Sequence, residues 1–372
     1  MKIDQRILKD YFSVEVYKDL YPIWRTLIGK TFNGYIGWTG YGNLGDEAVY
    51  AGYKTLFPNS KLISFRVSQP VQFFSAAIKR KIPARFVGLG GGTLINQSLS
   101  WLKQTEYLIK NEVPMFCLGT GVASRDFWKN HEHIRKANEI DKWVSLLNKF
   151  VYVGVRGPSS QKALQDAGLK AEIVGDAALA LAREKFRERN ERKIIGINLS
   201  AGTDNVMFGD ASKLVKEMII SIRKLIKEGF EIRLLPIWKD DLSLCKDIHK
   251  EIDSQSCKLI EAFDTLERYI EELDKCDLFI GLKLHATIFA TMLRIPSIML
   301  EYRPKCLDYM ESIDMGTYSI RTDQVTSALL LDKLRNQINN YRSIVSVLDS
   351  KIMHYRNLQK TKAELVLKNI YG

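Results

Sequence analysis

Apolar and polar positions alternate in blocks along this chain, and the blocks predict strands that are each followed by a helix. Short apolar runs end in polar or glycine-rich loops, and helical periodicity resumes after each loop, as at 47–56. The strands of the first half are expected at 35–38, 86–89, 114–118, 150–155 and 173–174. This rhythm is typical of a parallel α/β sheet.

The nearly all-charged segment 183–193 interrupts the rhythm and predicts a solvated helix end and a linker. The rhythm then restarts, with strands expected at 193–199, 231–237, 278–280 and 297–302 and helices at 211–228, 242–253, 266–276 and 285–293. From Gln324 onward only helical periodicity remains. We therefore expect two α/β domains, 1–185 and 193–323, followed by C-terminal helices over 324–372.

Composition narrows the class of protein. A hydrophobic content of 46% excludes wholesale disorder, and no apolar run approaches the ~18 residues of a membrane span. The first residues show no secretory signal, and five scattered cysteines predict reduced structural thiols, so we expect a cytoplasmic location. The charge balance, 55 − 43 = +12, favours acidic partners such as phosphorylated small molecules or an anionic membrane. Without a nucleic-acid-binding motif, no nucleic acid partner is expected.

Two glycine-rich loops follow predicted strands and are candidate anion sites. The first, GYGNLGDE, carries Asn43 and Asp46; its glycines permit close backbone approach, and Asp46 is placed to cap the next helix. Such a loop suits an anion or a sugar hydroxyl, with a tight structural turn as the alternative. The second carries Gly90, Gly91 and Gly92, whose amides could hold an oxyanion; close packing of helix on sheet is the alternative.

Two further strand ends carry charged residues. Arg156 follows the strand at 150–155, where a guanidinium is suited to bidentate binding of a carboxylate or phosphate. A surface ion pair is the alternative interpretation of Arg156. Asp176 follows the next strand and could orient Arg156 or cap the following helix.

The segment GLKLHA places Lys283 and His285 two residues apart where a strand meets a helix. Alternation in an extended segment would put both side chains on one side. Histidine is suited to general acid–base catalysis near neutral pH, although a capping or packing role is the alternative. Lys305, after the last strand, is a second candidate cation or part of a solvent-exposed turn. His131 and His133 lack a third ligand nearby, so no metal site is expected.

These motifs, taken in order, resemble those of the polysaccharide pyruvyltransferase family. The resemblance runs from about residue 34 to 305 and is carried by GNLGDE, GLGGGTLI, VGVRGPSS with GDAALAL, GLKLHATIFA, and Tyr302 with Lys305. It implies a GT-B-like α/β fold: two Rossmann-like domains facing a cleft, with a helical C-terminal tail. It also implies transfer of a pyruvyl group from phosphoenolpyruvate to sugar hydroxyls, forming a pyruvate ketal on a cell-surface polysaccharide or its precursor.

The resemblance also implies roles for individual residues. The family's basic-x-His signature falls on Lys283 and His285, with the histidine as general acid; the usual arginine is replaced by lysine, which keeps the charge without the bidentate fork. The family's strand-end arginine falls on Arg156, with Asp176 in the motif that follows. Arg156, Lys283 and Lys305 are then the expected cations for phosphoenolpyruvate. No cofactor beyond this donor is implied.

Other functions and partners stay open at this stage. A GT-B glycosyltransferase using a nucleotide sugar would share these features, with Glu301 as the candidate ribose ligand; a non-catalytic sugar- or phosphate-binding protein is a further alternative. The segment 68–81 mixes aromatic residues with a basic end and could contact the inner membrane face or a lipid-linked saccharide acceptor, or form an ordinary packed helix. Homo-oligomerisation is also left open.

Overall fold

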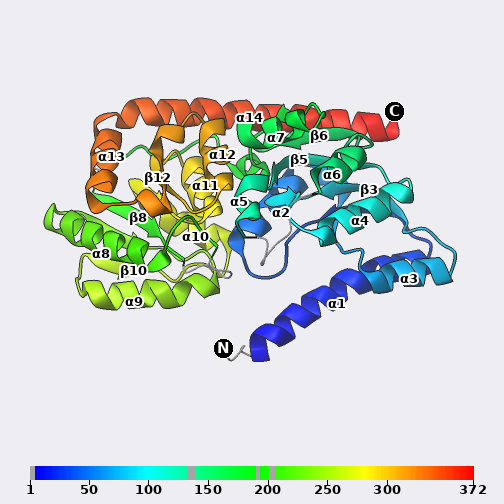
Figure 1. Cartoon of the computed structure of the whole chain (residues 1–372), viewed down its shortest axis with the longest axis horizontal. Coiled ribbons are helices and arrows are strands. Elements are labelled where there is room, and N and C mark those ends of the chain that lie inside the picture. The colour runs from blue at the N-terminus through cyan, green and yellow to red at the C-terminus, as the bar shows by residue number, and fades with distance from the viewer. Residues whose placement is uncertain (1–4, 132–138, 190–192, 201–205) are drawn as a thin grey trace. The chain divides into compact units, whose positions relative to one another are not determined.

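The computed structural model of the chain describes residues 5–131, 139–189, 193–200 and 206–372, and side chains from residue 14 onward (Figure 1). These residues form two compact units. Unit 1 comprises 1–41, 49–180 and 357–372, and unit 2 comprises 42–48 and 181–356. The short segment 42–48 therefore groups with the second unit, although the chain on both sides of it belongs to the first.

Unit 1 is built on one parallel sheet in the order β2-β1-β3-β5-β6-β7, with β4 paired to β5. Its strands are β1 (Phe32–Ile36), β2 (Ile63–Ser64), β3 (Ala84–Leu89), β4 (Thr93–Ile95), β5 (Met115–Val122), β6 (Tyr152–Val155) and β7 (Glu172–Ile173). Its helices are α1 (Gln5–Leu27), α2 (Leu44–Leu56), α3 (Gln69–Ala77), α4 (Leu99–Lys110), α5 (Arg125–Lys129), α6 (Ile140–Leu147) and α7 (Pro158–Asp166). The first turn of α2 belongs to unit 2.

Unit 2 is built on a second parallel sheet in the order β10-β9-β8-β11-β12-β13. Its strands are β8 (Ile194–Asn198), β9 (Glu231–Leu234), β10 (Cys257–Leu259), β11 (Leu278–Gly281), β12 (Ser297–Glu301) and β13 (Ser319–Arg321). Its helices are α8 (Ala211–Lys227), α9 (Leu242–Ile252), α10 (Leu266–Asp274), α11 (Leu284–Met292), α12 (Pro304–Ser312) and α13 (Ser327–Asn339).

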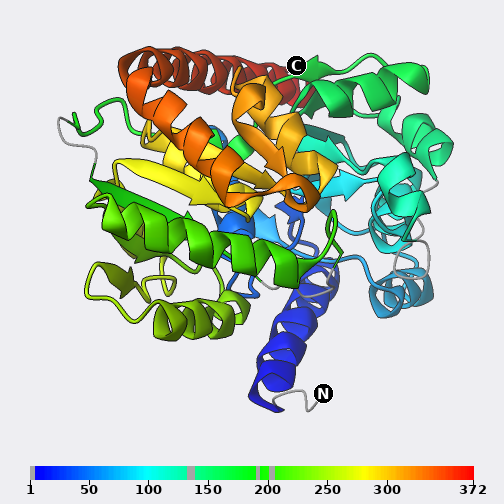
Figure 2. The ribbon, with the colours of Figure 1, turned by 60° about the vertical axis from the view of Figure 1, so that its left-hand side comes forward.

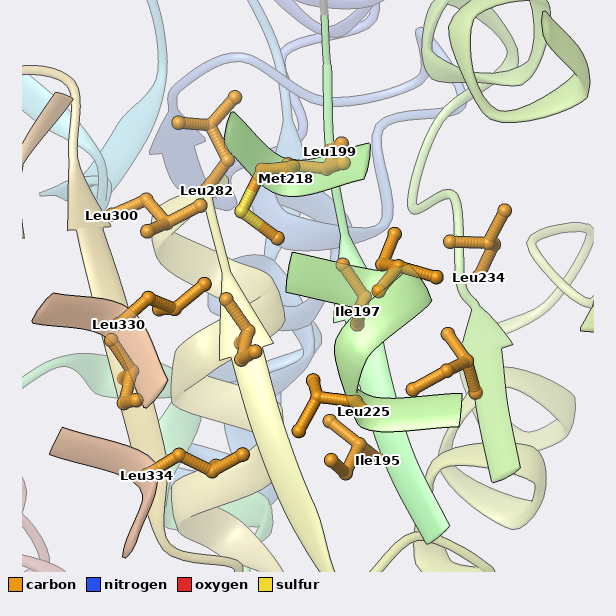
Figure 3. Packing of buried hydrophobic residues seen from close by; sticks show 14 of the residues in the cluster. Ile195, Ile197, Leu199, Met218, Leu225, Leu234, Leu282, Leu300, Leu330 and Leu334 are labelled. Atoms are coloured by element: carbon orange, nitrogen blue, oxygen red, sulfur yellow. The ribbon is translucent and has the colours of Figure 1, made fainter. Parts of the chain in front are cut away.

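The core of unit 2 explains why its strands appear in the sequence as continuous apolar runs. Figure 3 shows Ile195 and Ile197 of β8 in one cluster with Met218 and Leu225 of α8 and Leu330 of α13. A strand covered by helices on both faces has no polar side, so the alternation of a half-exposed strand is lost. The parallel α/β architecture predicted from the sequence is confirmed.

The charged segment after residue 182 is largely exposed, as its composition predicts, but Arg189 within it is buried. Arg189 is 8% exposed and donates hydrogen bonds to the carbonyls of Cys276 and Leu293 and to the Asp274 carboxylate. Arg187 pairs with Asp277 at 3.1 Å. Buried arginine can lie here because its donors all find acceptors.

The C-terminal helices are divided between the units. Helix α13 packs on α8 within unit 2. Helix α14 (Tyr341–Tyr371) begins in unit 2, and its residues from 357 onward belong to unit 1. There Gln359 donates to the carbonyls of Val174 and Asp176, each at 2.9 Å. Figure 2 shows α14 as one continuous helix.

All five cysteines are free and buried, as expected. Burial raises the pKa of the Cys117 thiol to about 12, so this residue is an inert core side chain. No helix within the described ranges is long and apolar enough to span a bilayer.

Candidate functional site

The strand order of unit 2 marks where a ligand is expected. Successive strands run outward in one direction from β8 to β9 and β10 and in the other from β11 to β12 and β13, so the order reverses between β8 and β11. In open α/β sheets, ligands bind outside the carboxyl ends of the strands at such a switch point. Asn198 ends β8, and its side chain accepts from the Lys283 amide at 3.0 Å, which ties the two strand ends together.

Lys283 lies directly after β11, as the N-cap residue of α11. Its ammonium is 3.6 Å from Oδ1 of Asp241 and 5.3 Å from the ring centre of Trp238. Only 18% of the Lys283 side chain is exposed. The carboxylate and the aromatic face therefore hold one cation at the switch point of the sheet.

Asp241 is the buried partner in this arrangement. Its carboxylate has 0% exposure and accepts from the Ile237 amide at 3.3 Å. Burial raises the pKa of Asp241 above its ordinary value, while Lys283 and a hydrogen bond from Ser200 oppose that rise. The ion pair therefore opposes the protonation of the carboxylate that burial favours.

His285 is the only residue of α11 that is not fully buried. Helix α11 is apolar almost throughout, and this single partly exposed side chain lies in its first turn. Because the strand ends at Gly281, His285 is helical, and the extended alternation predicted for Lys283 and His285 is wrong. Both side chains still lie at the start of one helix.

The imidazole of His285 packs against Gly45 in the first turn of α2. A Cβ placed on Gly45 would overlap the His285 ring, so only glycine fits there. The side chain of Asn43 accepts from the Gly45 amide at 3.0 Å and caps α2, so the prediction that Asp46 is the cap is wrong. Asp46 instead lies in the first turn of α2, where a carboxylate complements the helix dipole.

The next strand end along the sheet carries Lys305. It lies in the first turn of α12, after the N-cap residue Arg303, and not in a solvent-exposed turn. The Lys305 ammonium lies 5.0 Å from the ring centre of Tyr302. Since β11 and β12 are neighbouring parallel strands, Lys283 and Lys305 follow adjacent strand ends at the same edge of the sheet.

Glu301, the last residue of β12, is 6% exposed. Burial raises the pKa of Glu301 to about 7, although the nearby Arg321 opposes the rise. The side chain is therefore partly protonated near neutral pH.

Unit 1 holds the remaining candidate charges. Arg156 has 0% exposure and is not part of a surface ion pair. Its guanidinium donates long hydrogen bonds to the Gly92 carbonyl at 3.4 Å and to the Thr93 hydroxyl at 3.5 Å. Burial raises the pKa of Asp176, and the charge of Arg156 opposes that rise. Asp176 also accepts from the Ala178 amide at 3.0 Å, so it both faces Arg156 and caps a short turn.

The triple-glycine loop is tightly packed at its first two residues. The Gly90 amide donates to the Ile36 carbonyl at 2.8 Å, and the Gly91 amide donates to the Tyr35 hydroxyl at 3.4 Å. The expected pair of open amides at Gly90 and Gly91 is therefore not present. A Cβ at Gly91 would overlap Val49, which shows that these glycines serve close packing.

The structure thus brings together Gly45, Lys283 and His285 in unit 2, and Gly92, Arg156 and Asp176 in unit 1. Sequence reasoning missed Asn198, Trp238 and Asp241, although all three come at or shortly after predicted strands. Strand-end placement was therefore the signal that could have found them. Of the two histidines considered for a metal, His133 lies outside the described residues.

One comparison with known proteins identifies a family. A family model described as polysaccharide pyruvyl transferase matches residues 43–304, which is more than half of the 372 residues. The matched region starts at Asn43 and includes Lys283 and His285. No curated protein sequence matches the chain.

Solved structures show the fold. UDP-GlcNAc 2-epimerase from Neisseria meningitidis, bound to UDP-GlcNAc, is 12% identical with a TM-score of 0.56, covering 91% of this chain and 99% of its own. A putative UDP-N-acetylglucosamine 2-epimerase from Listeria monocytogenes is 9% identical with a TM-score of 0.54. The match covers 86% of this chain and 90% of the epimerase chain. At such identities the similarity concerns the fold, and it confirms the GT-B type of α/β fold with a helical C-terminal region.

Proposed function

Because the chain belongs to the polysaccharide pyruvyl transferase family, we propose that it transfers a pyruvyl group from phosphoenolpyruvate to two hydroxyls of a sugar, with His285 as general acid. The resemblance carried by the sequence motifs is confirmed by the family match. The observation that supports the role of His285 is its position. It is the one partly exposed residue of a buried helix, in the helical turn that follows the switch point of the sheet.

The reaction needs one proton donor and one sugar with two suitable hydroxyls. His285 gives a proton to the methylene carbon of phosphoenolpyruvate, which becomes a methyl group, and positive charge develops at C2. One hydroxyl attacks C2, the phosphate leaves with the C2–O bond, and the second hydroxyl closes the ketal. Two hydroxyl protons are released: one re-protonates His285 and the other leaves with phosphate or solvent. A positioned acid contributes about 10²–10⁴-fold to such a step.

Cations at the strand ends supply the binding of the donor. Phosphoenolpyruvate carries a carboxylate and a phosphate, and Lys283 and Lys305 offer ammonium groups at adjacent strand ends. Lys283 is held in place by Asp241, so its charge is oriented before the substrate arrives. Arg156 in unit 1, whose charge interacts with that of Asp176, is the third proposed cation, and Asn43 and Asp46 are proposed to bind the sugar at the start of α2.

Incubation with phosphoenolpyruvate and candidate saccharides tests the proposal, with phosphate release and acceptor mass as readouts. We expect phosphate release that depends on the acceptor and a product heavier by one pyruvate less one water. His285→Ala should lose both signals. Ketal formation that persists in the folded His285→Ala variant would remove His285 from the mechanism.

A glycosyltransferase using a nucleotide sugar is the second candidate, because Glu301 ends β12 where an acidic side chain could bind a ribose. Thermal unfolding separates the two donors. A ligand at 100 times its Kd stabilises the folded state by about 2.7 kcal/mol, so a shift with phosphoenolpyruvate and none with UDP-sugars supports pyruvyl transfer. The opposite pattern would favour the glycosyltransferase.

A further inference from the structure

Helix α1 presents apolar side chains to solvent along one face. Tyr17, Leu20, Trp24 and Leu27 are 59%, 55%, 51% and 53% exposed. Their spacing of three and four residues places them on one stripe of the helix. Large exposed side chains are ordinary when scattered, whereas a continuous stripe of them indicates a surface that binds something.

Three of the four charged residues in the described part of the same helix, 14–27, are turned toward the protein. Lys18 is 5% exposed and donates to the Thr39 carbonyl at 2.6 Å. Glu15 and Asp19, with side chains 13% and 17% exposed, both pair with Arg66. Over 14–27, α1 thus buries part of its charge and exposes part of its apolar surface, whereas an ordinary surface helix exposes its charges; Tyr21 and Ile23 still pack against the core of unit 1.

Helix α3 carries a further exposed apolar side chain. It packs against α1, and Figure 1 shows the two helices side by side. Its Phe73 is 78% exposed, the highest value among the large exposed apolar side chains of the described residues. Arg80, just after α3, donates to the carbonyls of Thr26 and Leu27 at the end of α1. We call Tyr17, Leu20, Trp24, Leu27 and Phe73 the α1–α3 patch.

The chain around the α1–α3 patch is basic. Lys30, Lys79 and Arg85 are exposed near the ends of α1 and α3, and Lys81 is exposed there in an ion pair with Glu112. The sequence from 48 to 105, which contains α3, has eight lysines and arginines and no aspartate or glutamate. Tyrosine and tryptophan at the level of the headgroups, with lysine and arginine beside them, are the composition of surfaces that bind anionic bilayers.

We infer that the α1–α3 patch docks unit 1 on an anionic lipid bilayer, with its apolar side chains among the headgroups and its basic residues against lipid phosphates. This inference is independent of the proposed reaction. A second copy of the chain fits the patch less well, because a two-fold symmetric interface would bring two basic rims together. The membrane surface, in contrast, offers both the apolar layer and the opposite charge.

Vesicle co-sedimentation of the full-length protein tests the inference. We expect binding to phosphatidylcholine vesicles containing phosphatidylglycerol, weak binding to pure phosphatidylcholine, and release at high salt. The paired change Leu20→Glu with Trp24→Glu should abolish binding. Lys30→Glu with Lys79→Glu should weaken it at least about fivefold per residue, as expected for basic residues at an anionic surface.

Matched controls lie in unit 2. Leu329→Glu on α13 and Lys250→Glu on α9 make the same kinds of change at exposed positions outside the patch and should leave binding unchanged. Circular dichroism and thermal unfolding establish that each variant is folded. The inference is overturned if the wild-type protein ignores anionic vesicles, or if the Leu20→Glu, Trp24→Glu variant still binds them. It is also overturned if sedimentation shows a dimer that only the patch variants disrupt, because the occupant is then a second copy.

Discussion

Gly45 and His285, 240 positions apart in the sequence, are in direct contact: the imidazole packs where a side chain of residue 45 would lie. The segment 42–48 that provides Gly45 belongs to the same compact unit as His285. Gly45 of the GNLGDE motif thus leaves space for His285 of the GLKLHATIFA motif.

Removing the imidazole should abolish turnover without unfolding the protein. We expect His285→Ala to lower kcat by about 10²–10⁴-fold, because the positioned proton donor is lost. Steady-state phosphate release measures the effect. His354→Ala, at an exposed position on α14, is the matched control and should retain wild-type activity. Comparable losses in the two variants would contradict a specific role for His285.

Filling the space at Gly45 should misplace the histidine. Gly45→Ala adds a Cβ that overlaps the imidazole, and a displacement of about 1 Å can cost 10²-fold in rate. Alanine has a higher helix propensity than glycine, so the change in backbone flexibility should not lower the thermal midpoint. Gly316→Ala, whose Cβ would meet nothing closer than the flexible Glu311 side chain at 3.2 Å, is the control for a harmless glycine substitution. Full activity in Gly45→Ala would show that the contact does not position His285.

Removing the ammonium beside Asp241 should make stability depend on pH. Burial already raises the pKa of Asp241, and Lys283 limits the rise, so Lys283→Met should raise that pKa further. A raised carboxyl pKa contributes stability at low pH that is lost as pH rises through the folded-state pKa. The stability gap between Lys283→Met and wild type should therefore be smallest in acid and widen with increasing pH. Urea unfolding from pH 4 to pH 8 measures it, and adding Asp241→Asn should remove its pH dependence.

Ionisation of Glu301 should make stability depend on pH a second time, at a higher pH. Its folded-state pKa is about 7 against an ordinary 4.5, so wild-type stability should fall between these values and level off above pH 7. The glutamine of Glu301→Gln cannot ionise, so the stability of this variant relative to wild type should increase between pH 4.5 and pH 7. Chemical denaturation of both proteins at pH 4, 5.5, 7 and 8 measures the difference. A constant difference over the whole range would show that Glu301 titrates normally.

Much of the fold could be predicted because strands buried on both faces appear in the sequence as continuous apolar runs. The predicted strand at 86–89 and the predicted helix at 211–228 agree with β3 and α8 to within two residues at each end. The short strands β2, β4, β10 and β13 were missed, since two or three residues carry too little periodicity to be recognised. Helix α1 was missed because its charged and apolar residues do not separate into a polar and an apolar face: Lys18 is buried, whereas Leu20 and Trp24 are exposed.

The sequence by itself determined the parallel α/β class, the family and the positions of Arg156, Lys283, His285 and Lys305 after strands, because strand ends and motif order are local properties. Only the tertiary structure decided which residues meet. It paired Lys283 with Asp241, set Gly45 against His285, and buried Arg189. Such contacts join residues tens to hundreds of positions apart, and no local pattern encodes the partner of a buried charge. The packing of the folded chain selects it.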